Sequence, residues 1–137
     1  MNNYFDVKWI SYFFFFIAAV VHIYFFILES FLFQKPNGYK IFKMNQHDHE
    51  AVKIWAFNQG FYNLFLAVGI LIGLYMVNQL EIKMAGMMIS FCGLSMIAAG
   101  LVLFFSNKKM RRGALIQILP PALGFFFLVF HIASHIK

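Results

Sequence analysis

Residues 58–63 place four polar side chains inside a long apolar stretch: Asn58, Gln59, Tyr62 and Asn63, here termed the amide cluster. Asn58 and Tyr62 are four residues apart, as are Gln59 and Asn63, so each pair shares a helical face. Amides in hydrocarbon cost free energy unless they are hydrogen-bonded. The cluster therefore faces either a polar binding site or other helices, where each interhelical bond would contribute under about 1–2 kcal/mol.

Three further polar residues lie in other apolar stretches: His22 and Glu29 in the first, and Gln117 in the last. His22 and Glu29 are seven residues apart and share one helical face. Ionisable groups within membranes usually face the bundle interior and mark function. Glu29 is either ionised and hydrogen-bonded by Gln59, Gln117 or Asn58, or protonated. Each residue also has an alternative without a function. The Glu29 side chain would extend to the membrane interface, and a neutral His22 would be hydrogen-bonded to a backbone or amide oxygen.

The composition excludes an ordinary soluble domain. The chain is 62% hydrophobic and 12% charged, with a mean hydropathy of +0.74, whereas soluble domains carry about 25% charged residues. The net charge of +6 arises from basic residues in short loops beside apolar spans. Such residues set membrane topology and contact lipid head groups, so we expect membrane lipids and not nucleic acid as partners.

The hydropathy pattern predicts an all-α integral membrane four-helix bundle. It forms a single transmembrane domain over residues 1–137, with spans at about 9–33, 51–77, 82–105 and 114–136. Each span can cross a hydrocarbon core of roughly 30 Å, which needs about 20 helical residues.

Most basic residues fall in the loops 34–50 and 106–113. The positive-inside rule predicts that these loops are cytoplasmic and that both termini are outside. In this topology Glu29, Asn58, Gln59 and Gln117 lie near the cytoplasmic edge. His22, Tyr62 and Asn63 lie deeper, so three spans place their polar residues in the same half of the membrane.

Histidines suggest metal sites at two places: the run His47-Asp48-His49-Glu50, which includes two acids, and the pair His131 and His135, which are four residues apart without a carboxylate nearby. Consecutive residues point in different directions on a helix, and neither place has a distant additional ligand. We therefore expect no metal site and no cofactor.

Small residues predict where helices approach closely. Gly69 and Gly73 form one pair, and Gly86, Ser90, Gly93 and Gly100 form one ridge on the third span. These surfaces pack on each other or on a second copy of the chain. The first is favoured because a tight turn joins the second and third spans. Pro120-Pro121 predicts a kink in the fourth span beside Gln117.

His22, Glu29, Asn58-Gln59-Gly60-x-Tyr62-Asn63 and Gln117-x-x-Pro120 carry a family resemblance. Over roughly residues 18–130 the chain resembles family thirteen-oh-four among the domains of unknown function, a family of small bacterial membrane proteins. Phe57 departs from the small residue more usual there. The resemblance implies a compact four-helix protein of the bacterial inner membrane and brings no established activity.

Three functions fit these observations. The first is binding, or transport, of a small amphipathic or lipid-like molecule at His22, Glu29, Asn58, Gln59, Tyr62, Asn63 and Gln117, with Glu29 complementing a cation. Because four spans are few for a transporter, transport would require a homodimer. The second is a membrane enzyme in which His22 and Glu29 act as acid and base; without a nucleophile, phosphate loop or metal cage, an enzyme is less favoured. The third is a structural or accessory subunit.

Overall fold

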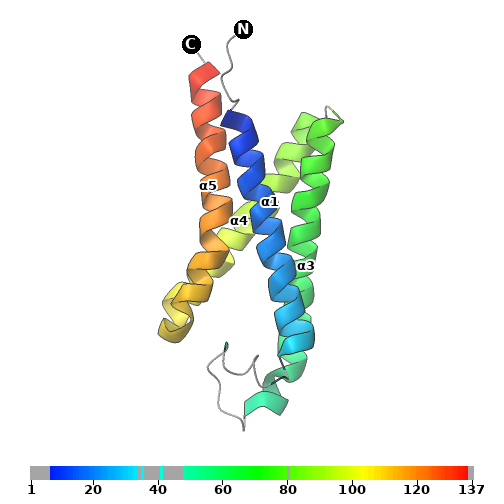
Figure 1. Ribbon diagram of the computed structural model, residues 1–137, viewed down its shortest axis with the longest axis vertical. Helices are drawn as coiled ribbons and strands as arrows, with labels where there is room; N and C mark the ends of the chain where they lie inside the picture. Colours follow the sequence, from blue (N-terminus) through cyan, green and yellow to red (C-terminus); the bar gives the residue numbers. More distant parts are fainter. Residues whose placement is uncertain (1–6, 34, 36–40, 42–47, 80, 136–137) are drawn as a thin grey trace.

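Four long helices make up the molecule, and the computed structural model describes them within residues 7–33, 35, 41, 48–79 and 81–135. The helices are α1 (Val7–Ile27), which continues into the π-helical turn η1 (Leu28–Leu32), α3 (His49–Asn78), α4 (Ile82–Ser106) and α5 (Arg111–His135), with a 3₁₀ turn η3 (Lys108–Met110) before α5 (Figure 1). The predicted all-α four-helix bundle is confirmed.

Among the residues that the structure describes, four segments are long and apolar enough to cross a membrane, as expected of a multi-pass membrane protein. They are Val7–Leu32, Glu50–Asn78, Ile82–Ser106 and Lys108–His135. Hydrocarbon leaves backbone groups without water, so each segment satisfies its N–H and C=O groups within its own helix. The predicted spans agree with these segments to within a few residues at most ends.

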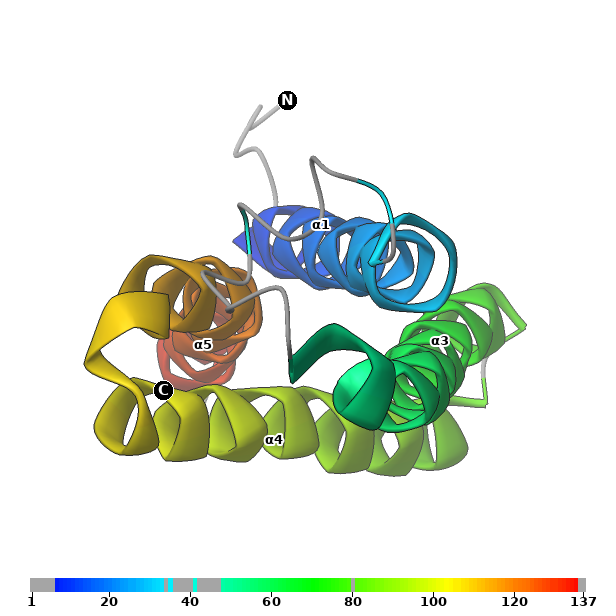
Figure 2. The ribbon, with the colours of Figure 1, turned by 90° about the horizontal axis from the view of Figure 1, so that it is seen from below.

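The helices form a ring in which α1 packs on α3 and α5, and α4 completes the circle between them (Figure 2). The start of α1, the turn from α3 to α4 and the end of α5 lie together (Figure 1). We call this the terminal end. The opposite end, where α1 finishes, α3 begins and α4 turns into α5, is the loop end.

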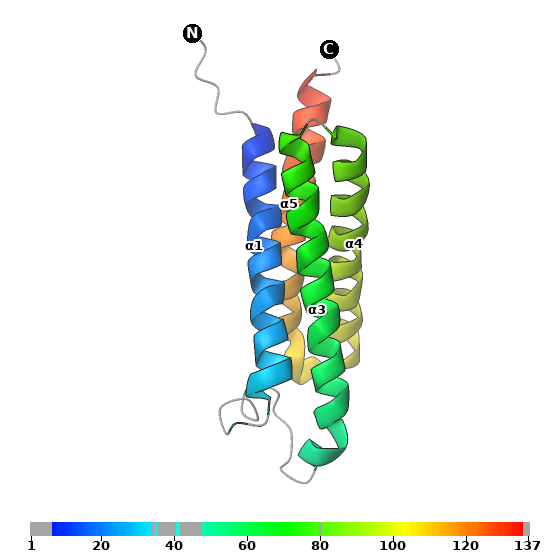
Figure 3. The same cartoon turned by 90° about the vertical axis from the view of Figure 1, so that its right-hand side faces the viewer.

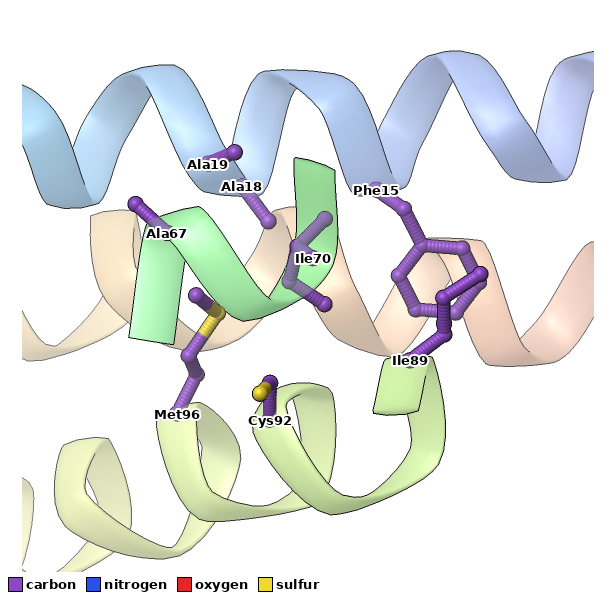
Figure 4. Packing of buried hydrophobic residues seen from close by; sticks show 8 residues of the cluster. All are labelled: Phe15, Ala18, Ala19, Ala67, Ile70, Ile89, Cys92 and Met96. Carbon is purple, nitrogen blue, oxygen red and sulfur yellow. The ribbon is translucent and has the colours of Figure 1, made fainter. Parts of the chain in front are cut away.

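Small residues form the part of the core where the helices approach most closely. Ala18 and Ala19 of α1 face Ala67 of α3, and larger side chains fill the remaining space (Figure 4). Because lipid tails are as apolar as the side chains, the hydrophobic effect does not drive helices together in a membrane. Close van der Waals packing of small residues stabilises the bundle instead. A buried hydrogen bond of 2.8 Å from Ser11 Oγ to the Gly124 carbonyl also joins α1 to α5.

The glycine pair of α3 and the glycines of the predicted ridge on α4 lie at different interfaces and do not pack on each other. Cβ atoms at Gly69 and Gly73 would meet Cys92 and Ile89 of α4 respectively, so this pair packs on α4 but not on the predicted ridge. Gly93 and Gly100 instead face α5, where a Cβ would meet Phe125 and Ile118 respectively. Gly86 has no atom within 4 Å of a built Cβ. The physical reason is that α4 is inclined across the bundle and changes neighbours along its length (Figure 1).

Towards the loop end the helices separate into two pairs, α1 with α3 and α4 with α5 (Figures 1 and 2). The first turns of α3 also extend beyond the end of α1 (Figure 3). The loop end is therefore the part of the bundle where side chains from opposite pairs can line a cavity.

Candidate functional site

Glu29 lies in the π-helical turn η1 and is bonded to α3. Asn63 Nδ2 donates a hydrogen bond of 2.8 Å to Glu29 Oε2, and Asn63 is only 5% exposed. Single π-helical turns within α-helices are rare and are frequent at functional sites. This carboxylate–amide bond is one of two described hydrogen bonds between η1 and α3 at the loop end.

Gly60 explains how α3 comes close enough to η1 for this bond. A Cβ at Gly60 would collide with Ser30 Oγ and would lie 3.1 Å from the Phe26 carbonyl oxygen and 3.2 Å from the Ser30 nitrogen. Ser30 Oγ also donates to the Phe57 carbonyl over 3.2 Å. The glycine between the amides is therefore where the two backbones touch, and it fixes the distance between Glu29 and Asn63.

A cavity of about 420 Å³, here called the inner pocket, lies between the two separated helix pairs. Most of its walls are apolar, and its polar groups are Glu29, Asn107 and Gln117. The full lining is Phe25, Leu28, Glu29, Ile41, Leu103, Asn107, Met110, Gly113 and Gln117. Every helix except α3 contributes, so the inner pocket depends on how the pairs are placed.

Gln117 lines the inner pocket but is bonded to α4. Its Nε2 donates to the Met96 carbonyl over 3.1 Å, and the residue is 8% exposed. Glu29 and Gln117 thus line the same pocket from different helices, and the described partner of Glu29 is Asn63. The bond from Gln117, Gln59 or Asn58, which was considered for an ionised Glu29, is not among the described hydrogen bonds.

Glu29 also lines two smaller cavities beside α3. The side hollow, of about 350 Å³, contains Asn58 and Gln59 and is lined by Glu29, Phe33, Val52, Trp55, Ala56, Asn58 and Gln59. The outer hollow, of about 330 Å³, is lined by Glu29, Ser30, Phe33, Glu50, Lys53, Ile54 and Phe57. One carboxylate therefore borders all three cavities.

The predicted depths were wrong for α3. Asn58 and Gln59 were expected level with Glu29, but Asn63 occupies that level. Because α3 extends beyond α1, the start of the second helix is not level with the end of the first. Tyr62 is 55% exposed and points away from the buried face that carries Asn63, so the structure does not bring it to Glu29.

His22 is fully buried and lies apart from Glu29. Its Nδ1 is 2.9 Å from the Ala18 carbonyl, which can only accept, so Nδ1 carries the proton and donates. Its Nε2 has no hydrogen-bond partner within the described parts of the chain, and its ring packs on Phe25 at 5.8 Å between centroids. None of the three cavities has His22 in its described lining.

No group of three or more potential metal ligands occurs among the residues that the structure describes. His131 and His135 have ring centroids 4.4 Å apart at the terminal end, and His135 Nδ1 lies 2.9 Å from the His131 carbonyl. His47 falls outside the described residues.

Sequence reasoning missed the apolar walls of the inner pocket and the two charged residues of the outer hollow, Glu50 and Lys53. Phe25 and Leu103 look like ordinary lipid-facing residues in the sequence, and Met110 falls in the predicted loop 106–113. A signal for the outer hollow was available, because Glu50, Lys53 and Phe57 are spaced on one helical face.

A family model described as a protein of unknown function (DUF1304) matches residues 16–129. This range includes every residue of the three cavities and confirms the resemblance found in the motifs. No curated protein and no solved structure matches the chain.

Proposed function

The chain belongs to the DUF1304 family, whose description assigns no activity, and we propose that it binds a small amphipathic cation in the inner pocket. One observation carries the proposal: Glu29 places a carboxylate on an otherwise largely apolar wall, and its described side-chain partner is the uncharged amide of Asn63. The cationic head of the ligand would lie against Glu29.

An ionised Glu29 would be stabilised by a positive charge beside it. Asn63 satisfies one carboxylate oxygen but does not neutralise it. An ion removed from water costs several kcal/mol unless an opposite charge compensates it, and intramembrane acids usually pair with a partner. A cationic ligand would provide that partner.

The walls suit the apolar part of such a ligand. Phe25, Leu28 and Leu103 offer hydrocarbon surface, and an aromatic ring such as that of Phe25 can attract a cation. The volume of about 420 Å³ falls within the roughly 300–1,000 Å³ of small-molecule sites. An amphipathic ligand matches this combination of one acid, two amides and apolar walls.

The pocket lies at the loop end, beside the basic residues Lys108, Lys109, Arg111 and Arg112. This charge supports a cytoplasmic loop end with both termini outside, in the bacterial inner membrane implied by the resemblance. The ligand would then enter from the cytoplasmic leaflet. Transport across the membrane would require a homodimer, and the proposal is limited to binding.

The experiment compares two probes of equal chain length, decyltrimethylammonium and decanesulfonate, on protein purified in a neutral detergent. The cation is expected to raise the unfolding temperature of the wild type, and the anion is not. Glu29→Gln should lose the response while Glu81→Gln, an acid at the terminal end, keeps it. Equal responses to both probes, or none, would reject the proposal.

The two other functions predict different results. An acid–base enzyme needs His22 and Glu29 at one substrate, and His22 lies outside the described lining of the inner pocket. A structural role for the Glu29–Asn63 bond predicts that Glu29→Gln changes stability without changing the response to the cation.

A further inference from the structure

The outer hollow lies between η1 and the first turns of α3 and shares only Glu29 with the described lining of the inner pocket, and we propose that it holds the head group of an aminophospholipid. Its polar residues are Glu29, Ser30, Glu50 and Lys53, and its volume is about 330 Å³. Glu50 and Lys53 do not line the inner pocket, so substitutions of Glu50 and Lys53 test this site separately from the proposed function.

The charges of the hollow match a zwitterion. Glu50 and Lys53 are three residues apart on one face of α3, and no salt bridge engages either of them among the described residues. Lys53 can hold a phosphate as a point charge. The carboxylates of Glu50 and Glu29 can accept charge-assisted hydrogen bonds from a primary ammonium. A choline head group lacks N–H donors, and an anionic glycerol head group lacks the cation.

The hollow also lies at the depth of lipid head groups. Ser30 Oγ bonds to the Phe57 carbonyl, so Phe57 is level with the last turn of the first span. Lys53 precedes it by four residues and therefore lies about 6 Å farther out along α3. Trp55, in the same turns, is 71% exposed, and exposed tryptophans are typical of membrane interfaces.

An aromatic ridge continues from the hollow towards the middle of the bilayer. Phe57, Phe61 and Phe65 lie one turn apart on α3, with ring centroids 5.1 Å and 6.3 Å apart. Phe26 of α1 packs on Phe61 at 5.0 Å. Phe57 and Phe65 are exposed and offer apolar surface to an acyl chain.

The order of groups along this face of α3 follows the order of groups along a phospholipid. Charges come first at Glu50 and Lys53, and phenylalanines follow from Phe57 onward. The phosphate and ammonium would lie in the hollow and one acyl chain would lie along the ridge.

The test is native mass spectrometry of the full chain after incubation with equal amounts of phosphatidylethanolamine, phosphatidylcholine and phosphatidylglycerol that carry the same acyl chains. Retention of phosphatidylethanolamine is expected to exceed that of phosphatidylcholine about tenfold, as one charge-assisted hydrogen bond would give. Glu50→Gln should remove most of this preference. Lys53→Gln should weaken retention of all three lipids.

Control substitutions of the same type outside the outer hollow show whether a change in lipid retention is specific to Glu50 and Lys53. Glu81→Gln and Lys83→Gln change one acid and one base at the exposed terminal end of α4, and both should retain the wild-type preference. Circular dichroism checks that each variant is folded, and Glu50→Asp should restore part of the preference. Preferential retention of phosphatidylglycerol, equal retention of the three lipids, or a preference unchanged by Glu50→Gln would overturn the proposal. Failure of decyltrimethylammonium to bind would reject the inner-pocket function and leave this result unaffected.

Discussion

Asn63 Nδ2 donates a 2.8 Å hydrogen bond to Glu29 Oε2, and this bond joins the π-helical turn of η1 to α3. It fixes the carboxylate where the inner pocket, the side hollow and the outer hollow meet. An amide can orient a carboxylate without neutralising it. The site therefore combines a fixed geometry with an acidic group, and the proposed function places the cationic head of the ligand against this group.

Asn63→Ala should lower the free energy of unfolding by about 0.5–1.5 kcal/mol, because it removes this interhelical hydrogen bond. Asn58→Ala is the control, since Asn58 is exposed and no described hydrogen bond engages its side chain. Titration with a denaturing detergent, followed by circular dichroism, measures both variants. Equal stability of the two would show that the Asn63 bond does not hold η1 to α3.

Gly60→Ala should destabilise the bundle by about 1–3 kcal/mol, because the new Cβ would meet Ser30 and the backbone of Phe26, which cannot move away easily. Gly86→Ala is the matched substitution, since a Cβ there meets nothing within 4 Å. Alanine favours a helix over glycine by up to about 1 kcal/mol, so Gly86→Ala should leave stability unchanged or raise it. Thermal unfolding in one detergent compares the pair, and a similar loss in both variants would contradict the close approach at Gly60.

Ser11→Ala should lower the free energy of unfolding by about 0.5–1.5 kcal/mol, because the Gly124 carbonyl in α5 loses the buried hydrogen bond that the Ser11 hydroxyl donates. Ser95→Ala removes a hydroxyl that bonds within its own helix, to the Phe91 carbonyl, and should have little effect. Unfolding midpoints measured side by side test this difference. A neutral Ser11→Ala would mean that α1 and α5 are held by packing alone.

Asn78→Cys and Lys109→Cys report the orientation in the membrane, because they lie at opposite ends of the bundle and the native Cys92 is buried. With both termini outside, a membrane-impermeant maleimide applied to intact cells should label Asn78→Cys and should label Lys109→Cys only after permeabilisation. The reverse pattern would invert the proposed topology.

The helices were predictable from the sequence, and the register between them was not. Long apolar runs have only a helical solution in lipid, so the spans follow from hydropathy. The level of one helix against another depends on where each emerges from the membrane, and α3 extends past α1 at its first turns. That extension brought Asn63 to Glu29 where Asn58 or Gln59 had been expected.

The site itself was predicted in part. Glu29 stood out because an acid in an apolar span is expensive, and the structure places it at all three cavities. The inner pocket could not be predicted, because its walls are common apolar residues such as Leu103 that line it only where the helix pairs separate. The exposure of Tyr62 follows from the same geometry, since only one face of α3 turns inward.

Isothermal titration of decyltrimethylammonium into the wild type, Glu29→Gln and Glu81→Gln tests cation binding at Glu29 most directly. The wild type and Glu81→Gln should bind the cation with equal affinity, and at one hundred times Kd binding should stabilise each by about 2.7 kcal/mol. Glu29→Gln should bind at least about tenfold more weakly, which corresponds to about 1.4 kcal/mol. Binding of equal strength to all three proteins would contradict the account.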